Sequence, residues 1–557
     1  MRDKAYMTEV ESLLEKLTEK EKDTLILSLA RRQEEKYEKA FLKLMGKKEI
    51  SPLPILMNQD EVMSFLKWLG EVNQGILYLE CSYDETDEDY PWDTGYEILY
   101  RDKEGIGSRM KEGVLLAEKL LQGKYYEEAL ALYDATLGTA VTAIEEESGE
   151  CMEMSFSDLV DEEIIQVDEA FFTLSRLLAV YDCKEKRERA EDFYEMLSQP
   201  RAHKLKLRDF WSVTSEELKG RETFLQEWID FLSEISGDRA EELLYEAAHE
   251  LGGVEKVTGL AGALKDIHPR LYLRSVELYM EEEKENEALA IGWKALEEIP
   301  GSLVIRAEIC DRMIQLALNM SDSEAVHRLM KLAFSSDSTL PRYLKLFQLP
   351  AFREVITAAS EEIGLLPKRL YSAERSFSRE LTTNSISDHE RDVIYFFSGS
   401  FHETFEKCKA DSTSLGWSSS LKGVVVPLLI LVLNKEEAQT EPADMLWKET
   451  LMKLEYGFSE EILLQDFMNW KQVMVEEIRE LEDYMDWVRD ETDKRVDAVV
   501  GGGFRQSYHK AALLITNLGE MLESRGYTGS RIELAERYRN RYKRHRAFKE
   551  ELNALGL

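Results

Sequence analysis

The chain has 557 residues with 71 Lys or Arg and 109 Asp or Glu, so its formal net charge is −38. This excess of acid disfavours non-specific nucleic-acid binding by the whole surface, because such binding depends on Lys and Arg displacing counterions from phosphates. Hydrophobic residues make up 44% of the chain, near the usual globular value, which argues against wholesale disorder.

Cysteine usage and the first residues indicate a cytoplasmic protein. The five cysteines lie far apart, at Cys81, Cys151, Cys183, Cys310 and Cys408. Structural zinc sites usually use close cysteine pairs, and a sparse, odd set is unlike a secreted disulfide framework. The starting string MRDKAYMTEVESLLEKL lacks the apolar core of a signal peptide. We therefore predict buried thiols, no metal and no cofactor.

The N-terminal region, residues 1–75, is predicted to be helical. Two helices are expected within residues 8–45, where Thr18 precedes Glu21 by the three-residue spacing of a capping box. A proline-containing break follows, and a further helix is expected around Glu61–Leu69.

The least helical stretch lies near 79–107, and residues 76–108 are predicted to form an irregular acidic insertion or a small hairpin. Strand-like LYLEC and YEILY flank the loop DETDEDYPWD. A calcium loop needs Gly at its sixth position and Glu at its twelfth, but counting from Asp87 gives Trp92 and Ile98. The loop is therefore interpreted as solvated, with Tyr90 and Trp92 as candidates for contact with a partner.

Residues 109–434 repeat a pattern of paired helices. The string AEKLLQGKYYEEALALYDATL at Ala117–Leu137 gives an apolar helix end, a short polar break and a second amphipathic helix. Val276–Leu296 and Val393–Thr413 follow it loosely. Such units cannot bury their apolar faces alone and must stack on neighbours. The predicted fold class is therefore all-α: a tetratricopeptide-like α-solenoid of stacked helix pairs.

The longest apolar run is Val424–Leu433, which includes Pro427. It is about half as long as a membrane span requires, so we predict a fully buried helix. A polar segment at 435–442 then leads to a C-terminal helical portion, residues 443–557. Three long helices are expected there, at about Glu460–Val500, Phe504–Arg525 and Ser530–Leu555.

Basic residues crowd the last of these helices, in contrast to the acidic chain as a whole. They are Arg537, Arg539, Arg541, Lys543, Arg544 and Arg546. We interpret them as candidate contacts for a partner or an anion. Tyr538 and Tyr542 lie among them, and rings between basic residues can stack on nucleic-acid bases. Because both rings share one helical side with Leu552, we expect them to pack inward and the arginines to dock on acidic helices or on a partner.

Motifs that can indicate catalysis or nucleotide binding are incomplete. Gly501–Gly503 precede a helix, but the string GGGFRQS lacks the lysine of a phosphate-binding loop, which favours a flexible turn. His249 and His402 are each followed by Glu, yet neither has the second histidine of the HExxH zinc motif. No GxSxG nucleophile motif occurs. We therefore predict no catalytic residue.

Four strings carry a family resemblance. They are LLEKLTEKEKDTLILSLA near the N-terminus, LGWSSSLKGVVVPLLILVL at Leu415–Leu433, RVDAVVGGGFRQSYHKAALLI at Arg495–Ile515 and YRNRYKRHRAFKEEL at Tyr538–Leu552. Together they resemble the long helical tail of bacterial SWIM zinc finger proteins. The resemblance implies an all-α, tetratricopeptide-like body. It does not carry the zinc chemistry across, because the SWIM motif needs a CxC pair followed by a CxH pair, and the chain has neither.

These features favour a non-enzymatic scaffold or adaptor whose helical repeats bind another protein or peptide. The first alternative is a nucleic-acid-associated protein that acts through the basic C-terminal helix. The second is an enzyme, because catalytic groups can converge from distant positions in an all-α scaffold. No membrane association is expected.

Overall fold

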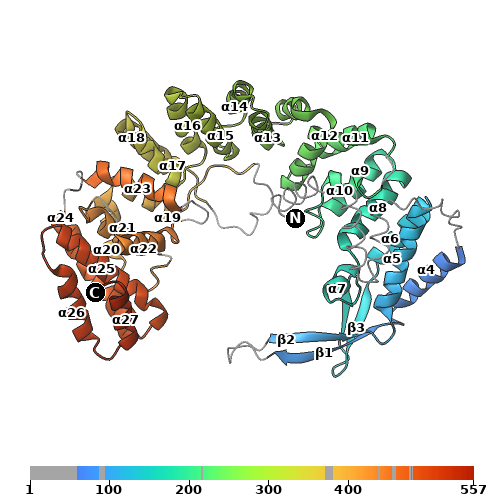
Figure 1. Ribbon diagram of the computed structural model, residues 1–557, viewed down its shortest axis with the longest axis horizontal. Helices are drawn as coiled ribbons and strands as arrows, with labels where there is room; N and C mark the ends of the chain where they lie inside the picture. Colours follow the sequence, from blue (N-terminus) through green and yellow to red (C-terminus); the bar gives the residue numbers. More distant parts are fainter. Residues whose placement is uncertain are drawn as a thin grey trace, which may run out of the picture. The chain divides into compact units, whose positions relative to one another are not determined.

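The computed structural model describes residues 59–86, 95–214, 218–369, 381–418, 420–436, 440–454, 460–475, 478 and 481–557. These residues fall into two compact units, Met1–Glu185 and Lys186–Leu557. Stacked helices dominate, which confirms the predicted all-α, solenoid-like class (Figure 1). The boundary between the units lies inside the segment 109–434. The helices predicted within 8–45, and the candidate residues Tyr90 and Trp92, lie outside the described residues.

The first unit combines helices with a small sheet. Its described helices are α4 (Gln59–Asn73), α5 (Ile106–Gln122), α6 (Tyr126–Leu137), α7 (Phe156–Asp161) and α8 (Glu169–Cys183). Its strands are β1 (Leu79–Thr86), β2 (Gly95–Arg101), β3 (Val141–Glu145) and β4 (Cys151–Met154), in the order β2-β1-β3-β4. The β1–β2 and β3–β4 pairs are antiparallel, whereas β1 and β3 are parallel.

One of these hairpins was predicted and the other was not. The β1–β2 hairpin, in which Cys81 faces Tyr100, confirms the hairpin expected near 79–107. The β3–β4 hairpin lies in a segment that the repeat pattern assigned to helix. Its first strand, VTAIE, is rich in β-branched residues and alternates between buried and half-buried positions, which favours a strand. Gly149 adopts a left-handed φ of 73° in the connecting turn.

The core of the first unit depends on close helix contacts. Phe65 on α4 packs against α5 at Gly113, where an added Cβ would lie 1.9 Å from the ring. Phe172 on α8 stacks on Phe156 at 4.7 Å between ring centroids and meets Tyr133 edge-on at 5.1 Å. Such ring pairs stabilise a core beyond the area that they bury.

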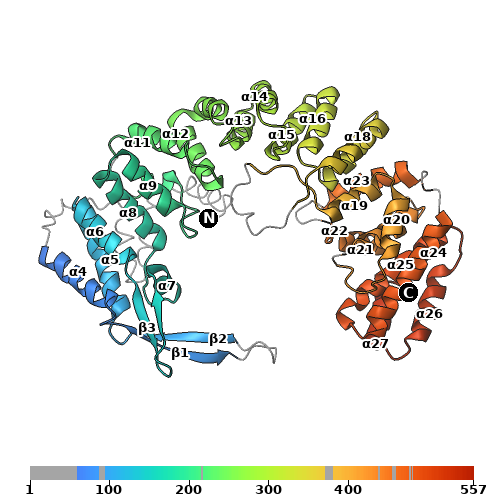
Figure 2. The same ribbon diagram turned by 180° about the vertical axis from the view of Figure 1, so that it is seen from behind.

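The second unit is helical in its described parts. Its first helices are α9 (Lys186–Leu197), α10 (Leu207–Trp211), α11 (Arg221–Leu232), α12 (Asp238–Ala263), α13 (Arg270–Glu281), α14 (Glu285–Glu298), α15 (Ile305–Asn319), α16 (Ser323–Ser336), α17 (Leu340–Lys345) and α18 (Phe352–Leu365). The later ones are α19 (Asp388–Phe397), α20 (Phe401–Ala410), α21 (Lys422–Leu433), α22 (Glu441–Leu451), α23 (Glu460–Met474), α24 (Leu481–Val496), α25 (Tyr508–Ser524), α26 (Ser530–Arg541) and α27 (Arg546–Ala554). From α11 to α16 each helix packs on the next, as Figure 2 also shows.

The three sequence repeats are helix pairs joined by one kind of turn. They correspond to α5–α6, α13–α14 and α19–α20, and α15–α16 has the same turn. One residue in each turn has a left-handed φ: Lys124, Glu283, Ser321 and Gly399. The next backbone N–H donates to the carbonyl five residues earlier: Tyr125 to Leu120 (3.0 Å), Lys284 to Tyr279 (2.8 Å), Asp322 to Ala317 (2.9 Å) and Ser400 to Tyr395 (3.0 Å). This is the Schellman motif, which satisfies carbonyls at a helix end.

The apolar run Val424–Leu433 lies within α21, and every residue of that helix is buried. This confirms the predicted buried helix. Among the described residues, none of the helices has both the length and the apolar character that crossing a bilayer requires.

The predicted C-terminal helices are shorter than expected. Glu460–Val500 contains α23, α24 and a π-helical turn at Asp497–Gly501, and the single helix expected at Ser530–Leu555 is broken between α26 and α27. The break follows from packing. Tyr542 and Phe548 are both buried, yet residues six apart on one continuous helix face different sides. Ending α26 at Arg541 lets both rings reach the core, where Tyr508 contacts Phe548.

Candidate functional site

Successive repeats are tied together by a series of ion pairs that we call the arginine ladder. Arg274 on α13 pairs with Glu241 on α12 (3.3 Å), Arg312 on α15 with Glu277 on α13 (3.0 Å), and Arg342 on α17 with Asp311 on α15 (2.6 Å). The partners are 33, 35 and 31 residues apart in sequence, which is about one helix-pair repeat. The ladder therefore fixes each repeat against the one before it.

The ladder is partly removed from water. Glu241 is only 2% exposed, and the Arg274 guanidinium also lies 5.0 Å over the Tyr245 ring. Burial disfavours the charge of Arg342, but Asp311 and Asp337 outweigh that effect and raise the pKa of its guanidinium above the ordinary value. These arginines and acids hold helices in register. The available sequence signal is that each arginine follows its acid by 31 to 35 residues, about one repeat.

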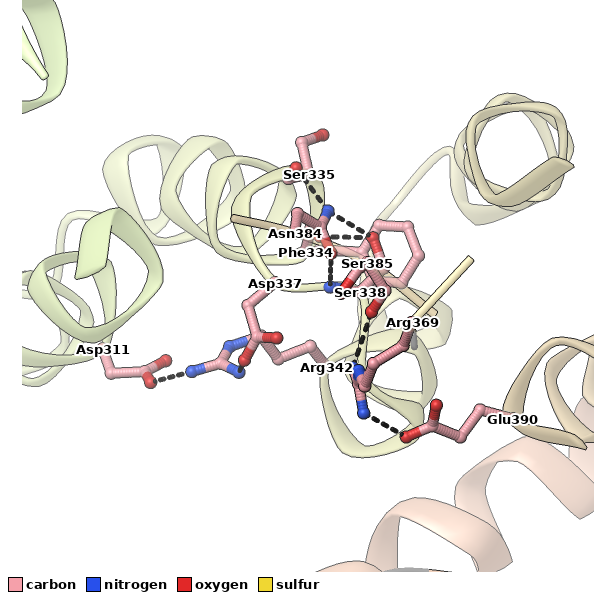
Figure 3. Close-up of polar contacts among 10 residues, drawn as sticks. All are labelled: Asp311, Phe334, Ser335, Asp337, Ser338, Arg342, Arg369, Asn384, Ser385 and Glu390. Atoms are coloured by element: carbon pink, nitrogen blue, oxygen red, sulfur yellow. Dashed lines mark hydrogen bonds and ion pairs between the residues drawn. The ribbon is translucent and has the colours of Figure 1, made fainter. Parts of the chain in front are cut away.

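A second polar cluster lies where an extended segment, residues 381–387, crosses the repeats (Figure 3). Asn384 is 4% exposed, and its Nδ2 donates to the Ser335 carbonyl and to Ser338 Oγ, both at 3.0 Å. Its Oδ1 accepts from the Ser338 N–H at 3.1 Å, and its own N–H donates to the Ser302 carbonyl at 2.7 Å. A fully bonded buried amide of this kind specifies one arrangement of the chain.

Arg369 secures the same segment from its other side. Its guanidinium pairs with Glu390 at 2.7 Å and donates to the Ser385 carbonyl at 2.6 Å (Figure 3). His389 lies beside a cavity of about 10 Å³, and burial holds the pKa of its imidazole below the ordinary value. A cavity of that size holds about one water molecule. The polar contacts are therefore suited to holding residues 381–387 in place, and the cavity beside them is too small for a ligand larger than water.

The basic C-terminal residues form contacts within the chain. Arg537 and Arg541 pair with Asp493 on α24 at 2.9 and 3.2 Å, and Arg541 also pairs with Asp497. Tyr538 donates a hydrogen bond to Asp493 at 2.8 Å. Burial acts against the charge of Asp493, but the Tyr538 hydrogen bond and the two arginines hold the pKa of its carboxyl below the ordinary value.

The other basic residues divide into two kinds. Arg539 donates to Asn553 and to the Leu557 carbonyl, and Arg546 pairs with Glu550 one turn further on at 2.9 Å. Lys543 and Arg544 are exposed, and within the described part of the chain their side chains form no ion pair. The buried Tyr538 and Tyr542 confirm that the rings pack inward.

The remaining sequence candidates lie apart from one another. His249 is exposed beside Tyr245, and Glu250 binds Trp211 Nε1 and Arg221, both at 2.9 Å. Gly503 has a φ of 78° in the connection that leads from the π-helical turn toward α25, and the three glycines at 501–503 are exposed. In the ranges that the structure describes, no three His, Cys, Asp or Glu side chains converge as metal ligands.

The prediction of buried thiols is correct for some cysteines and wrong for others. Cys81, Cys310 and Cys408 are buried, whereas Cys183 is half-buried and Cys151 is exposed on the edge strand β4. Burial raises the pKa of the Cys310 and Cys408 thiols to about 12, which keeps them protonated and unreactive. Cys151 begins the edge strand of the β3–β4 hairpin. The sequence did not reveal this hairpin, so the exposure of Cys151 was not predicted.

The fold and these contacts define the class: an all-α helical-repeat protein whose repeats are fixed in register by ion pairs. No protein-family model matches the chain, and no curated protein matches it at a significant level.

Proposed function

We propose that the chain is a non-enzymatic scaffold or adaptor that binds another protein or peptide through its helical repeats. The arginine ladder is the observation that carries this proposal. It holds α12, α13, α15 and α17 in fixed register, and a preorganised surface loses less conformational entropy on binding than a mobile one. Stacked helix pairs also offer a long surface to a partner without any reacting group.

Cross-linking in native lysate tests the proposal. The full chain is expected to recover a stoichiometric protein partner. Arg312→Ala removes one contact of the ladder and is expected to reduce that recovery severalfold. Arg187→Ala is the matched control, because Arg187 is 70% exposed and its pairs with Glu191 and, at 3.7 Å, with Glu234 lie outside the ladder. Recovery of background proteins alone by the unmodified chain would refute the proposal.

A nucleic-acid-associated function is the second candidate, and the exposed Lys543 and Arg544 favour it. Arg537 and Arg541, which are near them in sequence, pair with Asp493, and this pairing reduces the positive charge available to bind phosphates. Gel shifts at increasing salt decide the matter, since phosphate binding weakens steeply with ionic strength. The absence of a shift at low salt would eliminate this candidate.

The proposal includes a tetratricopeptide-like character for the helix pairs, kinship with the helical tail of SWIM zinc finger proteins, and a cytoplasmic location. The ladder separations of 33, 35 and 31 residues support the first, because tetratricopeptide repeats have a period of about 34 residues. The four quoted strings support the second. Recovery of the chain in membrane fractions of lysed cells would contradict the third.

A further inference from the structure

Three helices of the second unit enclose a groove of about 680 Å³ that the arginine ladder does not use. One wall is formed by α22, with Glu441 and Met445, and by Met452 directly after it; the opposite wall is formed by the end of α27, with Glu551, and by Leu555 directly after it. The helix α25 packs against both walls. Figure 1 shows the three helices gathered in the C-terminal part of this unit. We call this the C-terminal groove.

The floor and walls of the C-terminal groove are apolar and adaptable. Leu513 on α25 is 2% exposed and forms the floor. Met445 is 42% exposed and Met452 is 60% exposed, although both are large apolar side chains. Exposed methionines suit binding surfaces, because their flexible thioethers adapt to the shape of a partner. An exposed apolar groove with a charged rim is typical of a binding site.

The α22 wall is itself well fixed. The Thr440 hydroxyl accepts from the Ala443 N–H at 3.3 Å and donates to Glu520 on α25 at 2.6 Å. Asn517 on α25 donates to the Pro442 carbonyl at 3.0 Å. A partner would therefore meet a wall whose position is set before it binds, which lowers the entropic cost of binding.

The charges on the rim select the sign of the partner. Glu449 is already paired with Lys510 at 2.9 Å and lies 3.7 Å from His509. Glu441 and Glu551 stand on opposite walls, and within the described ranges neither carboxylate forms an ion pair. Lys448 is the basic residue of the lining and has an interaction of its own. Two unpaired carboxylates facing the same groove favour a partner that carries basic side chains on both flanks.

The dimensions of the groove select the form of the partner. The lining face of α22 runs from Glu441 to Met452, which is about 16 Å or three helical turns. The walls are helices whose backbone groups are already bonded, so an extended strand would find no unpaired sheet edge there. A helix can instead place apolar side chains between those of α22 and α27.

We propose that the C-terminal groove binds a basic amphipathic helix, about three turns long, from a partner protein. The apolar face of that helix packs on Met445, Met452 and Leu513, and its basic flanks lie against Glu441 and Glu551. This inference rests on the proposed scaffold function and names the chemistry of the partner.

Binding of three labelled synthetic peptides to the full chain, followed by fluorescence anisotropy, tests the proposal. The first peptide carries leucines at helical spacing with lysines beside them. In the second the lysines are replaced by glutamates, and in the third the leucines are replaced by serines. We expect the first to bind at least tenfold more tightly than the other two. Equal binding of the basic and acidic peptides would overturn the proposal.

Variants of the chain locate the binding site. Met445→Lys combined with Met452→Lys is expected to weaken binding of the basic peptide at least tenfold, while Glu441→Lys with Glu551→Lys shifts preference toward the acidic peptide. Met320→Lys is the matched control, because Met320 is 44% exposed and lies outside the groove. An unchanged affinity in the double methionine variant, or an equal loss in the control, would contradict the assignment.

Hydrogen exchange on the unmodified chain and the oligomeric state complete the test. Amide hydrogen exchange of the unmodified chain is expected to slow in α22 and α27 when the basic peptide is added, and protection elsewhere alone would refute the site. A dimer that the double methionine variant abolishes would assign the groove to a second copy instead. If that variant keeps its cross-linked lysate partner, the scaffold function stands and the groove proposal fails.

Discussion

Pro427, inside α21, affects a lysine in the turn that follows α22. Proline has no backbone N–H, so the carbonyl four residues earlier, that of Gly423, loses its helical donor. The Nζ of Lys453 donates to this carbonyl at 3.0 Å. Reaching it places the ammonium in a buried position, and burial lowers the pKa of Lys453 to about 8 although Glu449 acts in the opposite direction. A proline inside α21 thus leads to a buried amine whose pKa lies well below that of an ordinary lysine.

This lysine makes stability rise with pH. An unfolded lysine titrates near 10.4, so between about pH 8 and 10.4 the unfolded chain binds a proton that the folded chain has released. The free energy of unfolding should therefore increase by about 1–2 kcal/mol from pH 7 to 9.5 through Lys453 alone. Comparing thermal unfolding of the unmodified chain and Lys453→Met at both pH values isolates this effect. Lys409→Met, at an exposed lysine, is the control. An equal pH response of the unmodified chain and Lys453→Met would disprove the role of Lys453.

Asp493 also makes stability rise with pH, but in the acid range. Its pKa is held below the ordinary value, so its contribution to stability is present above about pH 4 and is lost as pH falls through the folded pKa. Because the carboxylate is 36% exposed and screened, we expect Asp493→Asn to cost only about 1 kcal/mol at pH 7 and nothing in acid. Thermal unfolding from pH 7 to 3 measures this. Asp486, which pairs with Arg489, is 76% exposed, and Asp486→Asn should have no effect at any pH.

At the scale of elements, the helix pairs were predictable because one local pattern determines them. An apolar helix end, a polar break and a second amphipathic run are visible in sequence, and the Schellman turns at Lys124 and Glu283 are local as well. The β3–β4 hairpin was missed because its strands are short and adjoin a confirmed repeat. The break at Tyr542 was missed because it depends on packing against α25, which is distant in sequence.

The shared turn makes one stabilising substitution available. Glu283 occupies the left-handed position that Gly399 occupies in another pair, and a side chain there strains the backbone. Glu283→Gly should therefore raise the free energy of unfolding by about 0.5–1 kcal/mol, less the entropy that glycine gains in the unfolded chain. Chemical denaturation measures it. Glu282→Gly, one residue earlier with a φ of −83°, is the control and should destabilise; stabilisation by both would exclude the turn as the cause.

At the scale of the whole molecule, the sequence revealed the class of fold but not the sites. The repeat pattern predicts stacked helices wherever it recurs. The C-terminal groove, by contrast, combines side chains near residues 441–452, 509–513 and 551–556, and nothing in one sequence says that these stretches meet. The basic C-terminal residues were visible as a group, yet their partner Asp493 lies 44 residues before Arg537. Local periodicity can be read directly, whereas pairing across helices requires the fold.

The first unit has a hydrophobic cluster from Val62 to Phe172, and the second unit has another from Phe334 to Leu552, so we expect calorimetry to show more than one unfolding transition. Gly113→Ala forces a Cβ against Phe65 and should destabilise the first unit by about 1–3 kcal/mol. Lys422→Met leaves Glu491, its partner at 3.0 Å and 5% exposed, with only the 57% exposed Lys494 as a cation, and should cost the second unit about 2–3 kcal/mol. Each variant should lower one transition and spare the other. If both variants lower the same single transition by similar amounts, the two units unfold as one cooperative unit.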